Sequence, residues 1–235
     1  MIYRCVREHN GPDTLLWCVD LPGVCTRGAD LVTAQKKMAG EIRSFLRWAG
    51  EDVPETVAVE ITAECACDLC VADADSDLLF ETERVPLTAA EYEWLKALAL
   101  RSAGDFEQQF CAIPDENASV LPPRKTFYGD LPRTAREMYD HTKNVNAYYF
   151  GEIGVAADND GTIARCRARG FAALEQQGDF LTRAAEEGSY GEWWSLRKVL
   201  RRFLWHDRIH ARAMYRMACR TFGEDAVENV FGFEK

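Results

Sequence analysis

The sequence lacks long hydrophobic runs and has no surplus of positive charge. Its charge-free runs are far shorter than the roughly 18 apolar residues of a membrane-spanning helix. Its first residues include Arg4, Arg7 and Glu8, where a signal peptide would have an apolar core. The formal net charge is -10, and affinity for nucleic acid comes largely from Lys and Arg that displace counterions. These absences predict a cytoplasmic protein with neither a membrane nor a nucleic acid as partner.

The composition also lacks the signs of disorder and of a disulfide framework. Hydrophobic residues make up 47% and charged residues 28% of the 235 residues, as in folded globular proteins. This length predicts a small domain joined to a medium one. The nine cysteines are scattered, odd in number and without a secretion signal, so we expect reduced thiols.

The N-terminal part alternates between strand and helix patterns. We expect strands at 1–8 and 14–20, a helix at 31–49 and a strand at 57–62. Turn residues at 10–13 and 22–23 separate the elements, and Asp30 is placed to cap the helix. The helix repeats apolar residues every three or four positions, as a helix packed on a sheet does. Acidic residues concentrate here, with 16 acidic against 8 basic residues in 1–86 and 22 against 20 in 87–235.

Part of this segment carries a family resemblance. The stretch Trp17-Cys18-Val19-Asp20-Leu21-Pro22-Gly23-Val24-Cys25-Thr26-Arg27-Gly28, with the helix after it and Pro54, resembles the HicB-like domain of bacterial antitoxins. The resemblance covers about residues 1–62. It implies a small αβ domain that contacts another protein, although the DNA-binding appendage of that family has no counterpart here. The alternative is an αβ module that only packs on its neighbour.

Two motifs in 63–88, one rich in cysteine and one rich in aspartate, are candidate metal sites. Cys65, Cys67 and Cys70 could bind zinc, but a closed site needs a fourth ligand that the sequence does not offer, so buried small side chains are the preferred interpretation. The alternating aspartates from Asp73 to Asp77 resemble a calcium loop, but the glycine and glutamate that such a loop requires are absent. We therefore interpret this segment as an acidic connection.

From residue 87 the periodicity is helical. We expect a first helix capped by Thr88, a second from about 132 to 153, a third from 161 to 187, and a fourth from Ser189 or Tyr190 to Phe222. Long helices with short joints favour an antiparallel four-helix bundle. The predicted fold class is therefore α+β, with a HicB-like αβ domain at 1–86 and a helical bundle at 87–235. The basic residues Arg197, Lys198, Arg201 and Arg202 are expected on a solvated helix face.

Three of the four histidines form a candidate metal site. His206 and His210 stand four residues apart, so both rings leave one face of the fourth helix. His141 lies beside the apolar positions of the second helix and is expected to point into the same bundle. Glu137, one turn earlier, is a candidate fourth ligand or general base, against the preferred alternative of a solvent-facing glutamate.

The helical part resembles a family that uses such histidines. Met138-Tyr139-Asp140-His141 with Asn144, and the run from Val199 to His210, are similar to the DinB-like superfamily, also called YfiT-like metal-dependent hydrolases, which includes bacillithiol and mycothiol S-transferases. The resemblance covers residues 87–223 and implies that His141, His206 and His210 are the metal ligands. Many members have a glutamine shortly after the second histidine of the pair, where this chain has Ala213 and Met214.

The resemblance implies one divalent metal ion, zinc or nickel first and iron as an alternative, since imidazoles suit several metals. It further implies a transferase that joins a small-molecule thiol to an electrophile. Tyr148, Trp194 and Tyr215 are candidate pocket aromatics. A metal-dependent hydrolase remains an alternative, as does a non-catalytic HicB-like interaction module on a metal-stabilised helical scaffold. A homodimer is also left open.

Overall fold

The protein combines a small sheet with a set of longer helices. The computed structural model describes residues 1–234, and its elements confirm the predicted α+β class. The chain divides into two compact units. The first unit is Met1–Thr82 with the described residues 231–234, and the second is Glu83–Val230. The division falls shortly before the predicted one at 86/87, and the last described residues belong to the first unit instead of the helical one.

The first unit is built on a four-stranded sheet of order β3-β2-β1-β4. β1 (Ile2–Asn10) pairs antiparallel with β2 (Asp13–Cys18) and parallel with β4 (Ala58–Ala66). β3 (Cys25–Gly28) adds an antiparallel strand to β2. The sequence did not predict β3, because its four residues have no apolar alternation.

The helix of the first unit, α1, spans Leu31–Ala49, as predicted. The Asp30 side chain accepts a hydrogen bond from the Thr33 backbone N–H, and Gly50 ends the helix with a φ of 79°. Fully buried side chains of α1 include Met38, Ile42 and Phe45.

The C-terminal residues join this unit through contacts with α1. Phe231 stacks on Trp48, with ring centroids 5.5 Å apart. The Ser44 hydroxyl donates to the Gly232 carbonyl over 3.1 Å. These contacts explain why the chain returns to the first unit after the last long helix.

The cysteines of the acidic connection are less buried than predicted. Cys65 and Cys67 are half-buried and Cys70 is exposed, so the expectation of three buried side chains is wrong. β4 is an edge strand, and most of its residues retain exposure. Side chains at its end therefore have fewer neighbours than those of a central strand.

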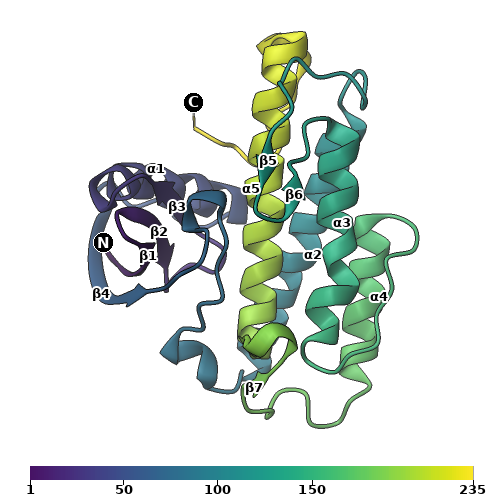
Figure 1. Ribbon diagram of the computed structural model, residues 1–235. Coiled ribbons are helices and arrows are strands. Elements are labelled where there is room, and N and C mark those ends of the chain that lie inside the picture. The colour runs from purple at the N-terminus through teal and green to yellow at the C-terminus, as the bar shows by residue number, and fades with distance from the viewer. Residues whose placement is uncertain (235) are drawn as a thin grey trace. The chain divides into compact units, whose positions relative to one another are not determined.

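The second unit is formed mainly by four helices, labelled in Figure 1. They are α2 (Ala89–Cys111), α3 (Ala135–Gly151), α4 (Ile163–Glu175) and α5 (Leu196–Phe222). α2 and α3 each pack against both α4 and α5, so α4 and α5 lie across this group from one another. Two short hairpins complete the unit, β5 (Lys125–Thr126) with β6 (Gly129–Asp130) and β7 (Glu186–Glu187) with β8 (Trp193–Trp194).

Two predicted helix boundaries are wrong, and local backbone chemistry explains both. The third helix ends at Glu175 instead of 187, shortly before Gly178. The fourth begins at Leu196, after the Ser195 N-cap, because residues 186–194 form the β7–β8 hairpin. Tyr190 and Gly191, with φ values of 61° and 75°, adopt the left-handed conformation in its turn.

Within residues 1–234, no helix is both long and apolar enough to cross a lipid bilayer.

Candidate metal centre

The structure brings the three predicted histidines together in the second unit. The His206 and His210 rings lie 4.4 Å apart, centroid to centroid, and the His141 ring lies 5.1 Å from His206 and 4.6 Å from His210. One ligand atom from each ring falls within 4.8 Å of the other two. In residues 1–234 this is the one group of three or more His, Cys, Asp or Glu side chains whose ligand atoms converge in this way. The cysteine and aspartate motifs of 63–88 form no such group.

Helix geometry and helix packing together produce this convergence. His206 and His210 are one turn apart on α5, so their rings leave the same face. α3 packs against α5 and carries His141. The site therefore depends on the alignment of two helices that are separated in sequence.

Burial keeps the three imidazoles neutral. His206 is 6% exposed, and the other two rings are half-buried. Burial, with a smaller contribution from His141, lowers the pKa of His210 to about 3. Burial also lowers the pKa of His141, and that of His206 falls well below its usual value through burial and the two neighbouring rings. A neutral imidazole is the form that binds a metal.

These donors fit a borderline divalent ion. The buried Nδ1 of His206 has no hydrogen-bond partner among residues 1–234, although buried polar atoms usually have one. Three imidazoles suit zinc, nickel, iron or copper. The group could therefore hold a metal ion, with coordination positions left for water or a substrate.

Glu137 takes part in helix capping and not in this cluster. It is exposed, and its carboxylate accepts hydrogen bonds from the backbone N–H groups of Arg133, over 2.7 Å, and Thr134, over 3.1 Å. The Thr134 hydroxyl in turn accepts from the Glu137 N–H, which completes a capping box at the start of α3. The hydrogen bonds from the Arg133 and Thr134 backbone lower the pKa of the Glu137 carboxyl.

Two aromatic residues that border the site, Tyr149 and Trp205, were not among the predicted pocket aromatics, and the Trp205 ring lies 6.0 Å from the His206 ring. The Tyr149 ring meets His206 edge-to-face at 6.0 Å and also contacts Trp194 at 5.6 Å. The predicted Tyr148 is 37% exposed and contacts Trp194, while Tyr215 is half-buried on α5. Helical spacing could have revealed Tyr149, because it follows His141 by about two turns on the same face.

A buried ion pair next to the histidines was also missed. The Arg167 guanidinium of α4 bonds both Asp207 carboxylate oxygens of α5, at 3.1 and 3.3 Å. Neither side chain is exposed to solvent. Burial raises the pKa of the Asp207 carboxyl, although Arg167 acts in the opposite direction. The two residues are 40 positions apart, so no local pattern links them.

Three of the four residues of the basic cluster on α5 are buried, contrary to the sequence-based prediction, and the fourth, Arg197, is half-buried. Lys198, Arg201 and Arg202 are 0%, 3% and 6% exposed. Glu192 pairs with Lys198 and with Arg202, and Glu83 pairs with Arg201 over 2.5 Å. Carboxylates outside the helix compensate these charges, Glu192 from the hairpin before α5 and Glu83 from 118 positions away, and the pattern of one helix cannot reveal them.

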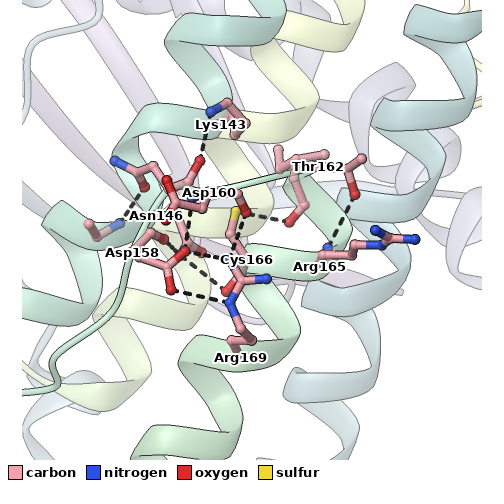
Figure 2. Close-up of polar contacts among 11 residues, drawn as sticks. Lys143, Asn146, Asp158, Asp160, Thr162, Arg165, Cys166 and Arg169 are labelled. Carbon is pink, nitrogen blue, oxygen red and sulfur yellow. Dashed lines mark hydrogen bonds and ion pairs between the residues drawn. The ribbon is translucent and has the colours of Figure 1, made fainter.

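Polar contacts fix the connection between α3 and α4, and Figure 2 labels Lys143, Asn146, Asp158 and Arg169 among the residues that make them. The Asn146 amide donates to the carbonyls of Asp158 and Cys166, and the Lys143 ammonium donates to the Asn159 carbonyl. Asp158 also pairs with Arg169 of α4. The helix that carries His141 is thus tied to α4.

Comparisons with protein-family models, with curated proteins and with solved structures found no match.

Proposed function

We propose that the second unit is a DinB-like four-helix bundle that binds one divalent metal ion through His141, His206 and His210. We further propose that it acts as a transferase that joins a low-molecular-weight thiol to a small electrophile. The observation that carries this proposal is the convergence of three neutral imidazoles from two packed helices. The family resemblance of residues 87–223 supplies the reaction type.

The residues around the cluster suit such a reaction. When bound, the metal would favour the thiolate form of a thiol near neutral pH and so supply the nucleophile. His141, His206 and His210 would hold the ion and leave positions free for that thiol. Tyr149 and Phe203 would limit water on one side, since Tyr149 contacts both His206 and Phe203.

A thiol-consumption assay tests the reaction type. The zinc-loaded protein is mixed with bacillithiol, mycothiol or a surrogate thiol and with an epoxide or haloaromatic electrophile. We expect faster thiol consumption than with chelator-treated protein or with His141→Ala, because both lack the complete ligand set. Equal rates in all three samples would contradict a metal-dependent thiol reaction.

A parallel assay separates the two alternatives. Metal-dependent hydrolysis of ester or amide substrates without any thiol would favour a hydrolase. Metal binding without turnover of either kind would favour a metal-stabilised scaffold for the HicB-like unit.

A further inference from the structure

One fully buried guanidinium touches all four helices of the second unit. Arg167 of α4 donates to Asp207 of α5, to the Asn146 side chain of α3 over 3.2 Å, and to the Ala99 carbonyl of α2 over 3.4 Å. Its guanidinium also lies 3.6 Å from the centroid of the Phe203 ring on α5. Because α4 lies across the group from α5, this side chain passes through the centre of the helical packing.

The partners of Arg167 are close in sequence to the candidate ligands. Asp207 directly follows His206 on α5. Asn146 follows His141 on α3 by little more than one turn. Arg167 therefore bonds one residue on each of the two helices that carry the histidines.

Stability alone does not account for a charged pair in this position. Burying an ion pair costs the hydration of both charges. Replacing such a pair by apolar residues of similar volume therefore often leaves the free energy of unfolding unchanged or raises it. A planar guanidinium differs from apolar packing in having fixed donor directions. A slide or rotation of α3 against α5 would break its bonds, whereas apolar side chains can repack.

We propose that Arg167 is a positioning residue that sets the alignment of α3 with α5, so that His141 meets His206 and His210. This inference rests on the proposed metal function. Its direct consequence is that the Arg167–Asp207 pair contributes to metal affinity more than to the free energy of unfolding.

The main test replaces both partners, so that no unpaired charge is left buried. We expect Arg167→Met/Asp207→Leu to remain folded, with a thermal midpoint close to that of the wild type. Zinc affinity, measured by competition with a chromophoric chelator, should fall about 10- to 100-fold, as for other residues that orient metal ligands. Wild-type zinc affinity in the folded double variant would overturn the proposal.

A second ion pair on the same helix provides a matched control. Arg169 lies two positions after Arg167 and pairs with Asp158, but both side chains are about half exposed (Figure 2). Arg169→Gln/Asp158→Asn removes an ion pair from α4 but keeps Arg167 and Asp207, and it leaves in place the Asp158 backbone carbonyl that accepts a hydrogen bond from Asn146. It should leave zinc affinity unchanged, and an equal loss in this variant would show that any disturbance of α4 weakens the site.

A metal-free measurement separates this inference from the proposed function. Histidine ring ¹H–¹⁵N spectra of chelator-treated protein report four residues, and His9 in the first unit serves as the internal reference. We expect the signals of His141, His206 and His210 to shift or broaden in the double variant while that of His9 stays. If the wild type binds no zinc but these signals still move, the alignment role stands and the metal function fails. If they do not move, the alignment role fails.

If the double variant does not fold, Arg167→Lys tests whether the guanidinium aligns the helices. It keeps the charge but loses the planar fork. We expect weaker zinc binding in a folded protein, and full wild-type affinity would contradict the role of the fork.

Discussion

At the scale of single residues, burial decides what the candidate site can do. An exposed histidine is partly protonated near neutral pH, and a protonated ring cannot bind a metal. The three rings of the cluster have lowered pKa values because they are withdrawn from water. The three rings are therefore in the neutral form, which is the form that can bind a cation.

This burial predicts a pH dependence of stability in the metal-free protein. An unfolded histidine gains its proton near pH 6.5, whereas His210 in the folded chain gains it near pH 3. Between these values the unfolded state binds more protons, so the free energy of unfolding should fall as pH falls. The slope from one such histidine is at most about 1.4 kcal/mol per pH unit.

Urea unfolding with a chelator between pH 7 and pH 4.5 measures this slope. His210→Gln should show a shallower decline than the wild type, because it lacks one of the titrating groups. Curves of equal slope would contradict a buried neutral His210.

The sequence predicted part of the site for a clear physical reason. His206 and His210 follow a local helical rule, and the apolar neighbours of His141 indicated an inward face. The same helical spacing could have predicted Tyr149. It could not have predicted Arg167 and Asp207, because a contact between diagonal helices leaves no trace in local periodicity.

At the scale of elements, capping residues predicted boundaries better than apolar patterns did. Asp30 and Thr88 cap α1 and α2 at the predicted positions. The third helix was predicted too long, because charged and apolar residues continue past Glu175 while the chain turns into a hairpin. Helical spacing alone cannot show this end, because Phe180 and Leu181 pack against the core although they lie outside the helix.

Close packing between α3 and α4 predicts the effect of one glycine substitution. A Cβ at Gly170 of α4 would overlap the fully buried Phe150 ring of α3. Gly170→Ala should therefore lower the free energy of unfolding by about 1–3 kcal/mol, since the core is overpacked. Gly104→Ala in α2 is the control, because a Cβ there meets open space.

The control should stabilise the protein by about 0.4–1 kcal/mol, as alanine restricts the unfolded chain. Chemical denaturation measures both variants. A neutral or stabilising Gly170→Ala would show that α3 and α4 are packed less tightly than described.

At the scale of the whole molecule, the chain forms two compact units, and the candidate site belongs to one of them. The histidine cluster, the Arg167 network and the buried basic cluster all lie within Glu83–Val230. The sheet, α1 and the C-terminal aromatic residues form the other unit. The sequence predicted a division in the 63–88 region from the change in periodicity, but nothing local showed that Phe231 returns to the first unit.

This division predicts that the helical unit keeps its site without the sheet. A fragment of residues 83–230 should show a helical circular dichroism spectrum and bind zinc with an affinity within about tenfold of the full chain, a free-energy difference of about 1.4 kcal/mol. An unfolded fragment would show that the unit needs the rest of the chain to fold. A folded fragment without zinc binding would show that the ligand set is incomplete.

The central claim of the account is that His141, His206 and His210 hold one divalent ion in the full chain. Equilibrium dialysis against zinc, followed by elemental analysis, tests it most directly when the wild type is compared with the variant in which all three histidines are alanine. The account predicts one zinc per chain in the wild type and none in the triple variant, while the nine cysteines remain in both. Full zinc content in the triple variant, or none in the wild type, would contradict it.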